Sequence, residues 1–145
     1  MFPIKNLDDL KSLSERMKWQ YFEKLVGWIF EKNGFETEVN KVIIFEKGRR
    51  QFDVVARRFQ TAFLAECKKW SAKRSKTSLV KSAAERHIEK CRLYRETEAN
   101  EVIPLVVTLM QEDIVSHENI PIVPIEKLNS FINHFEEFKD KIAVL

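Results

Sequence analysis

The stretch "QFDVVARRFQTAFLAECKKW" (Gln51–Trp70) decides the fold of this 145-residue chain. It contains two apolar runs of strand length, Phe52–Phe59 and Ala62–Lys68, separated by the polar pair Gln60-Thr61. Two such runs joined by so short a connection are typical of an antiparallel hairpin. We therefore expect this hairpin to lie in the middle of a sheet.

Each of the two runs carries a carboxylate among its apolar residues, Asp53 in the first and Glu66 in the second. Because successive strand residues point to opposite faces, Glu66 and Lys68 share one face and project side by side. Asp53 lies opposite them only in one hairpin register, and the sequence leaves that register open. Charged groups in a sheet interior are costly unless they are paired or bound to a metal.

Two interpretations of these three residues remain open at this point. In the first, Glu66 and Lys68 form a structural ion pair, and Asp53 stands near a surface turn. In the second, Asp53, Glu66 and the main-chain carbonyl of Cys67 bind Mg²⁺ or Mn²⁺, because hard cations prefer oxygen ligands. Lys68 would then orient a metal-activated water or stabilise negative charge in the transition state.

The rest of the chain supplies helices and further strands around this hairpin. We expect a mixed α/β fold, with a central sheet flanked by helices in the order α-β-β-β-α-β-β-α and one domain over residues 1–145. The link across residues 62–109 is long enough for a parallel strand–helix–strand crossover. Outside the hairpin, the predicted elements are helices over 15–32, 79–94 and 126–141, and strands over 35–45, 103–110 and 120–123.

Composition excludes several classes of protein. No apolar run approaches the ~18 residues that a membrane span requires, and the start, MFPIKNLDDLKS, lacks the apolar core of an export signal. We therefore expect a cytoplasmic protein with no membrane partner. With only three glycines, the chain cannot build a glycine-rich phosphate loop, so no nucleotide cofactor is expected.

Charge is distributed unevenly along the chain. Residues 41–95 contain 16 Lys and Arg against 5 Asp and Glu, whereas the remainder contains 9 basic and 17 acidic residues. A basic middle third around the two acids predicts a polyanionic partner, and we expect DNA. The residues predicted to contact it are Arg49, Arg50, Lys69, Trp70, Lys73, Arg74 and Lys76.

Three segments together, "FEKLVGWIFEKNGFETEV", "FDVVA" and "LAECKKW", resemble the PD-(D/E)XK nuclease superfamily, closest to its Mrr-like restriction endonucleases. The resemblance covers residues 18–125 and includes the element order. It implies a restriction-endonuclease-like core and a Mg²⁺-dependent endodeoxyribonuclease. It also implies that Asp53 and Glu66 are metal ligands, that Lys68 is the catalytic lysine, and that Glu23 is a first-helix acid assisting metal binding, directly or indirectly.

One part of the superfamily pattern is missing. The second helix lacks a clear Gln-x-x-x-(Tyr/Lys) element, for which Lys81 and Glu85 are the candidate substitutes. Two other functions fit the same residues: a Holliday-junction resolvase of this fold, and a non-catalytic DNA-binding or assembly subunit. Because one small active site cuts one strand at a time, we also expect a homodimer.

Overall fold

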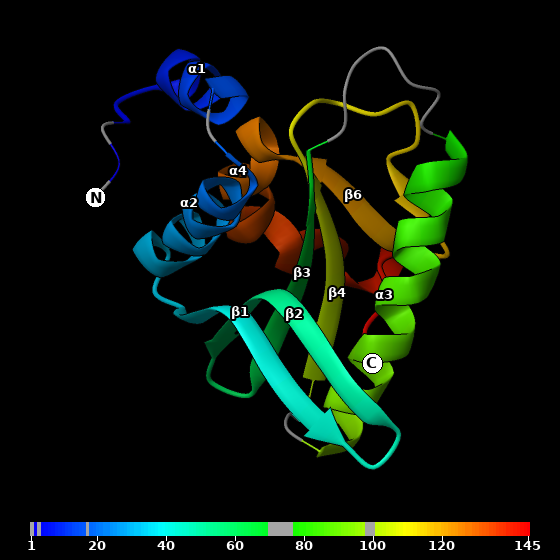
Figure 1. Ribbon diagram of the computed structural model, residues 1–145. Coiled ribbons are helices and arrows are strands. Elements are labelled where there is room, and N and C mark those ends of the chain that lie inside the picture. Colours follow the sequence, from blue (N-terminus) through cyan, green and yellow to red (C-terminus); the bar gives the residue numbers. More distant parts are fainter. Residues whose placement is uncertain (1, 3, 17, 70–76, 98–100) are drawn as a thin grey trace.

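The computed structural model describes residues 2, 4–16, 18–69, 77–97 and 101–145 (Figure 1). Within these residues two helices precede three strands, and one long helix separates those strands from three further strands. The elements are α1 (Leu7–Arg16), α2 (Trp19–Lys32), β1 (Glu36–Phe45), β2 (Gly48–Arg58), β3 (Thr61–Lys68), α3 (Thr77–Thr97), β4 (Glu101–Thr108), β5 (Ser116–His117), β6 (Ile120–Pro124), α4 (Ile125–His134) and the 3₁₀ helix η1 (Phe135–Lys141).

The six strands form one mixed sheet in the order β1-β2-β3-β4-β6-β5. β1, β2 and β3 pair antiparallel, so the hairpin predicted from the sequence is confirmed. β3 and β4 pair in parallel, and α3 makes the crossover between them, as the long connection predicted. The expected mixed α/β fold is therefore confirmed.

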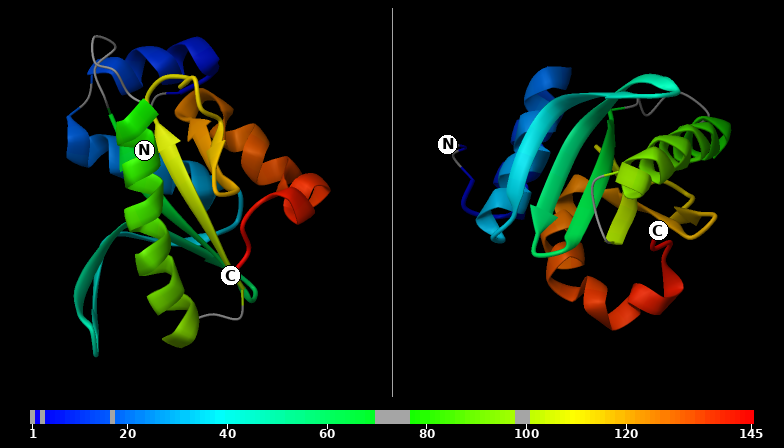
Figure 2. Two further views of the ribbon diagram at one scale, coloured as in Figure 1. Left: turned by 90° about the vertical axis from the view of Figure 1, so that its right-hand side faces the viewer. Right: turned by 90° about the horizontal axis from the view of Figure 1, so that it is seen from below.

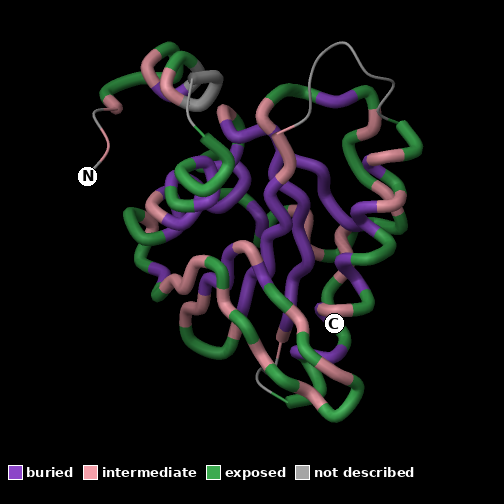
Figure 3. The backbone as a smooth tube through the Cα atoms, viewed as in Figure 1, coloured by how far each residue is buried: buried purple, intermediate pink, exposed green. Residues whose placement is uncertain are grey.

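Helices cover both faces of the sheet, with α2 and α4 on one face and α3 on the other (Figures 1 and 2). Side chains alternate between the two faces, so each face has its own hydrophobic core. The α2-side core includes Phe22, Phe30 and Phe63, and the α3-side core includes Leu64 and Tyr94. Buried backbone therefore concentrates along the central strands (Figure 3), and both cores hold β3 from opposite sides.

The first predicted helix begins in the wrong place. The chain forms two helices here, α1 and then α2, rather than one helix over residues 15–32. Trp19 is the first residue of α2 and is 40% exposed. The end of the helix is correct, because Gly34 takes the left-handed conformation (φ 87°) that stops it.

The C-terminal helix is also shorter than predicted. α4 ends at His134 and continues as a 3₁₀ segment with a non-helical residue at Phe138. The chain then turns back to the sheet, where the backbone of Leu145 exchanges two hydrogen bonds with Val102 (2.8 and 3.1 Å). The two-residue strand β5 was not predicted, because two residues are too few to show an alternating pattern.

None of the described helices has the length and apolarity needed to span a bilayer.

Candidate active site

The predicted site lies where β2 separates from β3. The two strands pair from Arg58↔Thr61 to Val54↔Ala65, and no pair is recorded beyond that point. The next residue on each strand is Asp53 and Glu66, so the register that the sequence left open places these two acids opposite one another. β3 remains paired with β4 as far as Lys68↔Thr108, so the end of β3 is held firmly while β2 leaves it.

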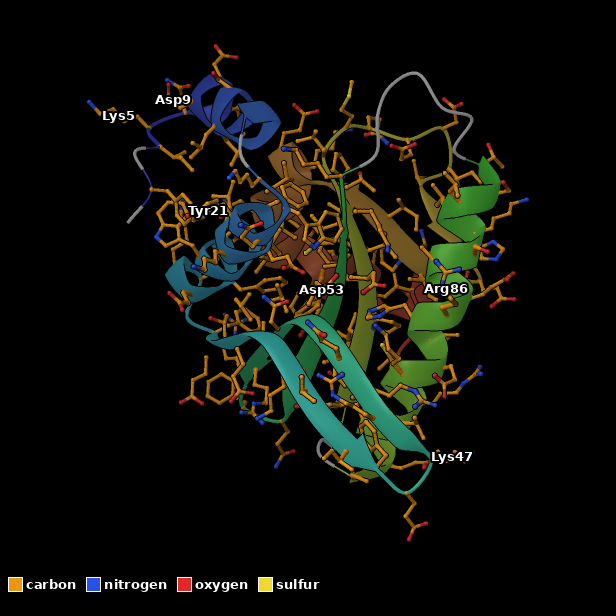
Figure 4. The ribbon with its side chains drawn as sticks, in the orientation of Figure 1. Lys5, Asp9, Tyr21, Lys47, Asp53 and Arg86 are labelled. Carbon is orange, nitrogen blue, oxygen red and sulfur yellow. The ribbon has the colours of Figure 1, made fainter. Side chains whose placement is uncertain are left out.

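Asp53 is fixed by the strand that it has left. The backbone N–H of Cys67 donates a hydrogen bond to Asp53 Oδ2 at 2.8 Å. This bond takes the place of a backbone pair between β3 and β2. Asp53 consequently lies in the middle of the molecule, between α2 and α3 (Figure 4).

A third acid approaches from α2. Glu23 lies at the border of the apolar stripe of α2, and it is only 2% exposed. It lies within hydrogen-bonding reach of Asp53, as does Glu66. Asp53, on β2, therefore has one acidic neighbour from α2 and another from β3.

Burial and the neighbouring acids change the pKa of Asp53 strongly. Burial is the main cause that raises the pKa of Asp53 to about 8, and the charge of Glu66 and hydrogen bonds with Glu66 and Glu23 raise it further against the opposing Cys67 N–H. Near neutral pH, Asp53 therefore keeps a proton. A site where a proton relieves carboxylate repulsion also suits a divalent cation, and carboxylate oxygens are ligands that Mg²⁺ and Mn²⁺ prefer.

Glu66 behaves in the opposite way. Burial alone would raise the pKa of Glu66, but His87, Lys90, the hydrogen bond with Asp53 and Lys68 together outweigh burial and lower it. Near neutral pH, Glu66 is therefore ionised while Asp53 holds its proton. Because the environments push the two pKa values apart, Asp53 and Glu66 are inequivalent, which is frequent at functional sites.

Two lysines contact the ionised Glu66. Lys68 Nζ lies 3.9 Å from Glu66 Oε2, and it also lies 5.9 Å from the ring centroid of Trp19. Lys90 Nζ, from α3, lies 3.3 Å from Glu66 Oε1 and donates to the carbonyl of Gln51 at 2.9 Å.

The contribution of α3 differs from the sequence interpretation. Lys90 reaches the acids, whereas the candidates Lys81 and Glu85 are exposed. A signal for Lys90 was present in the sequence. It follows His87 by three residues and Ala83 by seven, which places it on the sheet-facing side of the helix.

His87 packs behind Glu66 and is fully buried. Its Nε2 lies 2.6 Å from the Leu64 carbonyl and therefore carries the proton that is donated there. Burial lowers the pKa of His87 to about 4, so the ring is neutral near pH 7. Cys91 Sγ lies 3.4 Å from the same Nε2. His87 and Cys91 thus form a packed pair that lines the α3 side of the site.

The residues predicted to contact DNA are only partly described. Arg49 is exposed. Arg50 forms a salt bridge with Glu89, in which Arg50 Nη2 lies 3.0 Å from Glu89 Oε1. Both arginines lie on β2 between Asp53 and the hairpin tip at Lys47 (Figure 4). Lys69 directly follows β3. Trp70, Lys73, Arg74 and Lys76 lie outside the described residues, so the expected DNA contacts remain predictions.

A second cluster of residues with atoms that could bind a metal lies away from Asp53. Among the described residues, Glu85, His117 and Glu118 form the group of three whose donor atoms all lie within 4.8 Å of one another. Glu85 and Glu118 are exposed, and His117 Nε2 lies 3.1 Å from Glu85 Oε1. This hydrogen bond accounts for the contact between α3 and β5 without a metal ion.

Comparison with known proteins places the site in context. A family profile described as "Restriction endonuclease", that of the Mrr catalytic domain, matches residues 14–94, which include Glu23, Asp53, Glu66, Lys68 and Lys90. An uncharacterised protein from Archaeoglobus fulgidus is 34% identical over 129 residues, which are 89% of this chain and 100% of the relative.

Two solved structures share the fold. The small subunit of the heterodimeric restriction endonuclease R.BspD6I superposes with a TM-score of 0.57 at 18% identity, over 93% of this chain and 86% of that one. A protein of unknown function, AF1548, superposes with a TM-score of 0.52 at 19% identity, over 63% of this chain. The match spans 47% of AF1548, so this chain corresponds to about half of that protein.

Proposed function

Because this chain belongs to the Mrr-type restriction endonuclease family of PD-(D/E)XK nucleases, we propose that it is a divalent-metal-dependent endonuclease that hydrolyses phosphodiester bonds in DNA. The observation that carries this proposal is the meeting of Glu23, Asp53 and Glu66 at the end of β3, with Lys68 3.9 Å from Glu66. Family resemblance alone would allow a protein that had lost its acids, and this one retains them in contact.

Asp53 and Glu66, with the main-chain carbonyl of Cys67, would hold Mg²⁺ or Mn²⁺, and Glu23 would support Asp53. When bound, the ion polarises the phosphodiester and makes a water molecule more acidic. Asp53 would give up its proton when it holds the ion, because a metal ligand must be deprotonated and a nearby positive charge stabilises a buried carboxylate. The Cys67 N–H, which donates to Asp53 Oδ2, would hold Asp53 in both protonation states and favours the ionised carboxylate.

Lys68 and Lys90 have different tasks in this scheme. Lys68 follows Glu66 by two residues at the end of β3 and is half-buried, so its ammonium group can orient the attacking water or stabilise the developing phosphorane charge. Lys90 is held by both Glu66 and the Gln51 carbonyl. It keeps Glu66 ionised and oriented, and thus acts as a positioning residue.

DNA is the proposed substrate on two grounds. The family is that of restriction endonucleases, and the middle of the chain, which carries the site, also carries most of the basic residues. Lysine and arginine contacts to phosphates give affinity that does not depend on sequence and falls steeply with salt. We assign this role to the predicted contact residues, beginning with Arg49 and Lys69.

The direct test is a cleavage assay on supercoiled plasmid with Mg²⁺, Mn²⁺ or EDTA. Asp53→Asn and Lys68→Ala should abolish metal-dependent nicking while leaving DNA retention in gel-shift assays largely intact. The exposed residues Glu137 and Lys141 supply matched controls, since Glu137→Gln and Lys141→Ala make the same chemical changes away from the site. Undiminished nicking by both site variants would refute the assignment.

The same assay distinguishes the alternative functions. Faster cleavage of a four-way junction than of linear duplex would identify a resolvase. No cleavage of any substrate, together with no Mn²⁺ binding in calorimetry, would identify a non-catalytic subunit. Nicks without double-strand breaks would indicate that each chain cuts one strand and requires a partner, either a second copy or a different subunit as in the heterodimeric enzyme of similar fold.

A further inference from the structure

The β1–β2 hairpin changes faces halfway along its length. On β2, Phe52 packs in the α3-side core while Val54, two residues later, packs in the α2-side core. On β1, Val39 contacts the α2-side core while Ile43, four residues later, contacts the α3-side core. Residues separated by an even number should share a face, so the alternation of both strands is reset between these positions.

The reset occurs at a single cross-strand position. The recorded pairs Val39↔Val54 and Lys41↔Phe52 place Asn40 opposite Asp53, and this intervening pair is itself missing from the ladder. Asn40 has a left-handed backbone with φ 57°, which asparagine adopts more readily than most residues other than glycine. β2 bends sharply along its length (Figure 1), and Asp53 lies at this bend (Figure 4).

The side chain of Asn40 is also held. Gln51 Nε2 donates to Asn40 Oδ1 at 3.2 Å, from the strand opposite. Asn40 is exposed and packs in neither core. Its conformation is therefore not explained by hydrophobic packing of its own side chain. Asp53, which stands opposite Asn40, has no ladder partner on β1 or on β3.

We propose that Asn40 is a positioning residue for Asp53. Its left-handed conformation turns the distal half of the hairpin towards α3 and leaves the Asp53 carboxyl between Glu23 and Glu66, where the Cys67 N–H receives it. An extended residue at position 40 would continue the regular alternation of β1, and Asp53 would rejoin the ladder. This inference rests on the proposed function only in treating Asp53 as a metal ligand.

A matched control exists elsewhere in the sheet. Asn119, in the turn between β5 and β6, has φ 65° and belongs to neither strand at the candidate site. Alanine at either position imposes a comparable backbone penalty, because a Cβ disfavours the left-handed region. The free energy of unfolding should therefore fall by a similar amount in Asn40→Ala and Asn119→Ala. Only Asn40→Ala should also change the position of Asp53.

The experiment compares full-length wild type with Asn40→Gly, Asn40→His, Asn40→Ala and Asn119→Ala. Mn²⁺ affinity is measured by calorimetry, and protection of the Cys67 amide is measured by hydrogen exchange without metal. We expect Asn40→Ala to bind Mn²⁺ about tenfold or more weakly and to lose Cys67 protection. Glycine, which takes the left-handed conformation freely, should retain both properties, and Asn119→Ala should retain both despite its lower melting temperature.

Histidine tolerates the left-handed region better than alanine, so the Mn²⁺ affinity and Cys67 protection of Asn40→His should lie between those of the glycine and alanine variants. If the alanine variant does not fold, Asn40→His takes its place in the comparison. Wild-type Mn²⁺ affinity and Cys67 protection in Asn40→Ala would overturn the inference, as would equal losses in Asn119→Ala. If wild type shows no Mn²⁺ binding that Asp53→Asn removes, the proposed function fails instead. The Cys67 amide then still decides whether Asn40 positions Asp53.

Discussion

Among the described residues, two groups of side chains offer atoms that could bind a metal, and they differ most in burial. Glu85, His117 and Glu118 bring three donor atoms within 4.8 Å of one another, but the Glu85 side chain is 57% exposed. Glu23 and Glu66 are 2% and 8% exposed and both lie against Asp53. Water stabilises the charges of the first group, whereas the second group requires a proton, a lysine or a metal.

The largest expected effect comes from neutralising one acid in each group. Glu66→Gln should reduce metal-dependent cleavage by at least ~100-fold, because it removes a ligand charge from a buried site. Glu85→Gln should leave the cleavage rate within a factor of about two, since its carboxylate is solvated. Initial rates on supercoiled plasmid at fixed Mn²⁺ measure both. Equal losses in the two variants would erase the distinction between the groups.

A smaller effect is expected from the lysines of α3. Lys90→Met removes the ammonium that lies 3.3 Å from Glu66, so cleavage should fall by about 10- to 100-fold and the pKa of Glu66 should rise. Lys81→Met changes an exposed lysine on the same helix and should have no measurable effect. Rate measurements from pH 4 to 9 check this, because only Lys90→Met should shift the acidic limb of the profile.

The pH dependence of stability offers a third comparison. Unfolded Asp53 ionises near 3.8 and folded Asp53 near 8, so the folded state retains a proton that the unfolded state has lost. This contribution to stability is full below pH 3.8 and is lost as pH rises towards 8. The pKa of His87 is lowered from 6.5 to about 4. Its contribution to the free energy of unfolding therefore rises with pH, but only below pH 6.5.

Between pH 6.5 and 8 the slope therefore belongs to Asp53. The free energy of unfolding of metal-free protein should fall there by at most about 1.4 kcal/mol per pH unit. Urea denaturation at several pH values in EDTA measures it. Asp53→Asn should flatten the slope and Glu85→Gln should not, so a slope that persists in Asp53→Asn would place the titrating group elsewhere.

The smallest effect is expected in the exposed group. His117→Gln breaks a surface contact with Glu85, and such contacts contribute about 0–1 kcal/mol. Its melting temperature should therefore change little, and the change should shrink further in high salt. Thermal denaturation at low and high ionic strength tests this. A large, salt-independent loss would mean that the contact between α3 and β5 has a structural role beyond an ion pair.

Much of the fold could be predicted from the sequence, because long periodic segments determine it. The alternation of faces expected in 62–68 is present, since Phe63, Ala65 and Cys67 pack in one core and Leu64 packs in the other. The long connection correctly predicted a parallel crossover. The break between α1 and α2, and the end of α4 at His134, were not predicted. Hydrophobic periodicity shows which face of a helix is buried but locates its ends poorly.

The candidate site was predictable in its residues but not in its geometry. Asp53, Glu66 and Lys68 stood out as charges within apolar strands, whereas their meeting depends on a hairpin register that the sequence does not fix. The face change at Asn40 could not be foreseen, because it violates the period of two on which strand prediction rests. Lys90 was missed for a different reason, since a lysine on a helix is ordinarily assigned to solvent.

The metal site is tested most directly by titrating wild type, Asp53→Asn and Glu118→Gln with Mn²⁺ in a calorimeter at pH 7.5. The central claim is that the buried acids, and not the exposed group, bind the metal. It predicts that Asp53→Asn abolishes the binding heat while Glu118→Gln leaves affinity and stoichiometry unchanged. Binding that survives in Asp53→Asn and disappears in Glu118→Gln would contradict it.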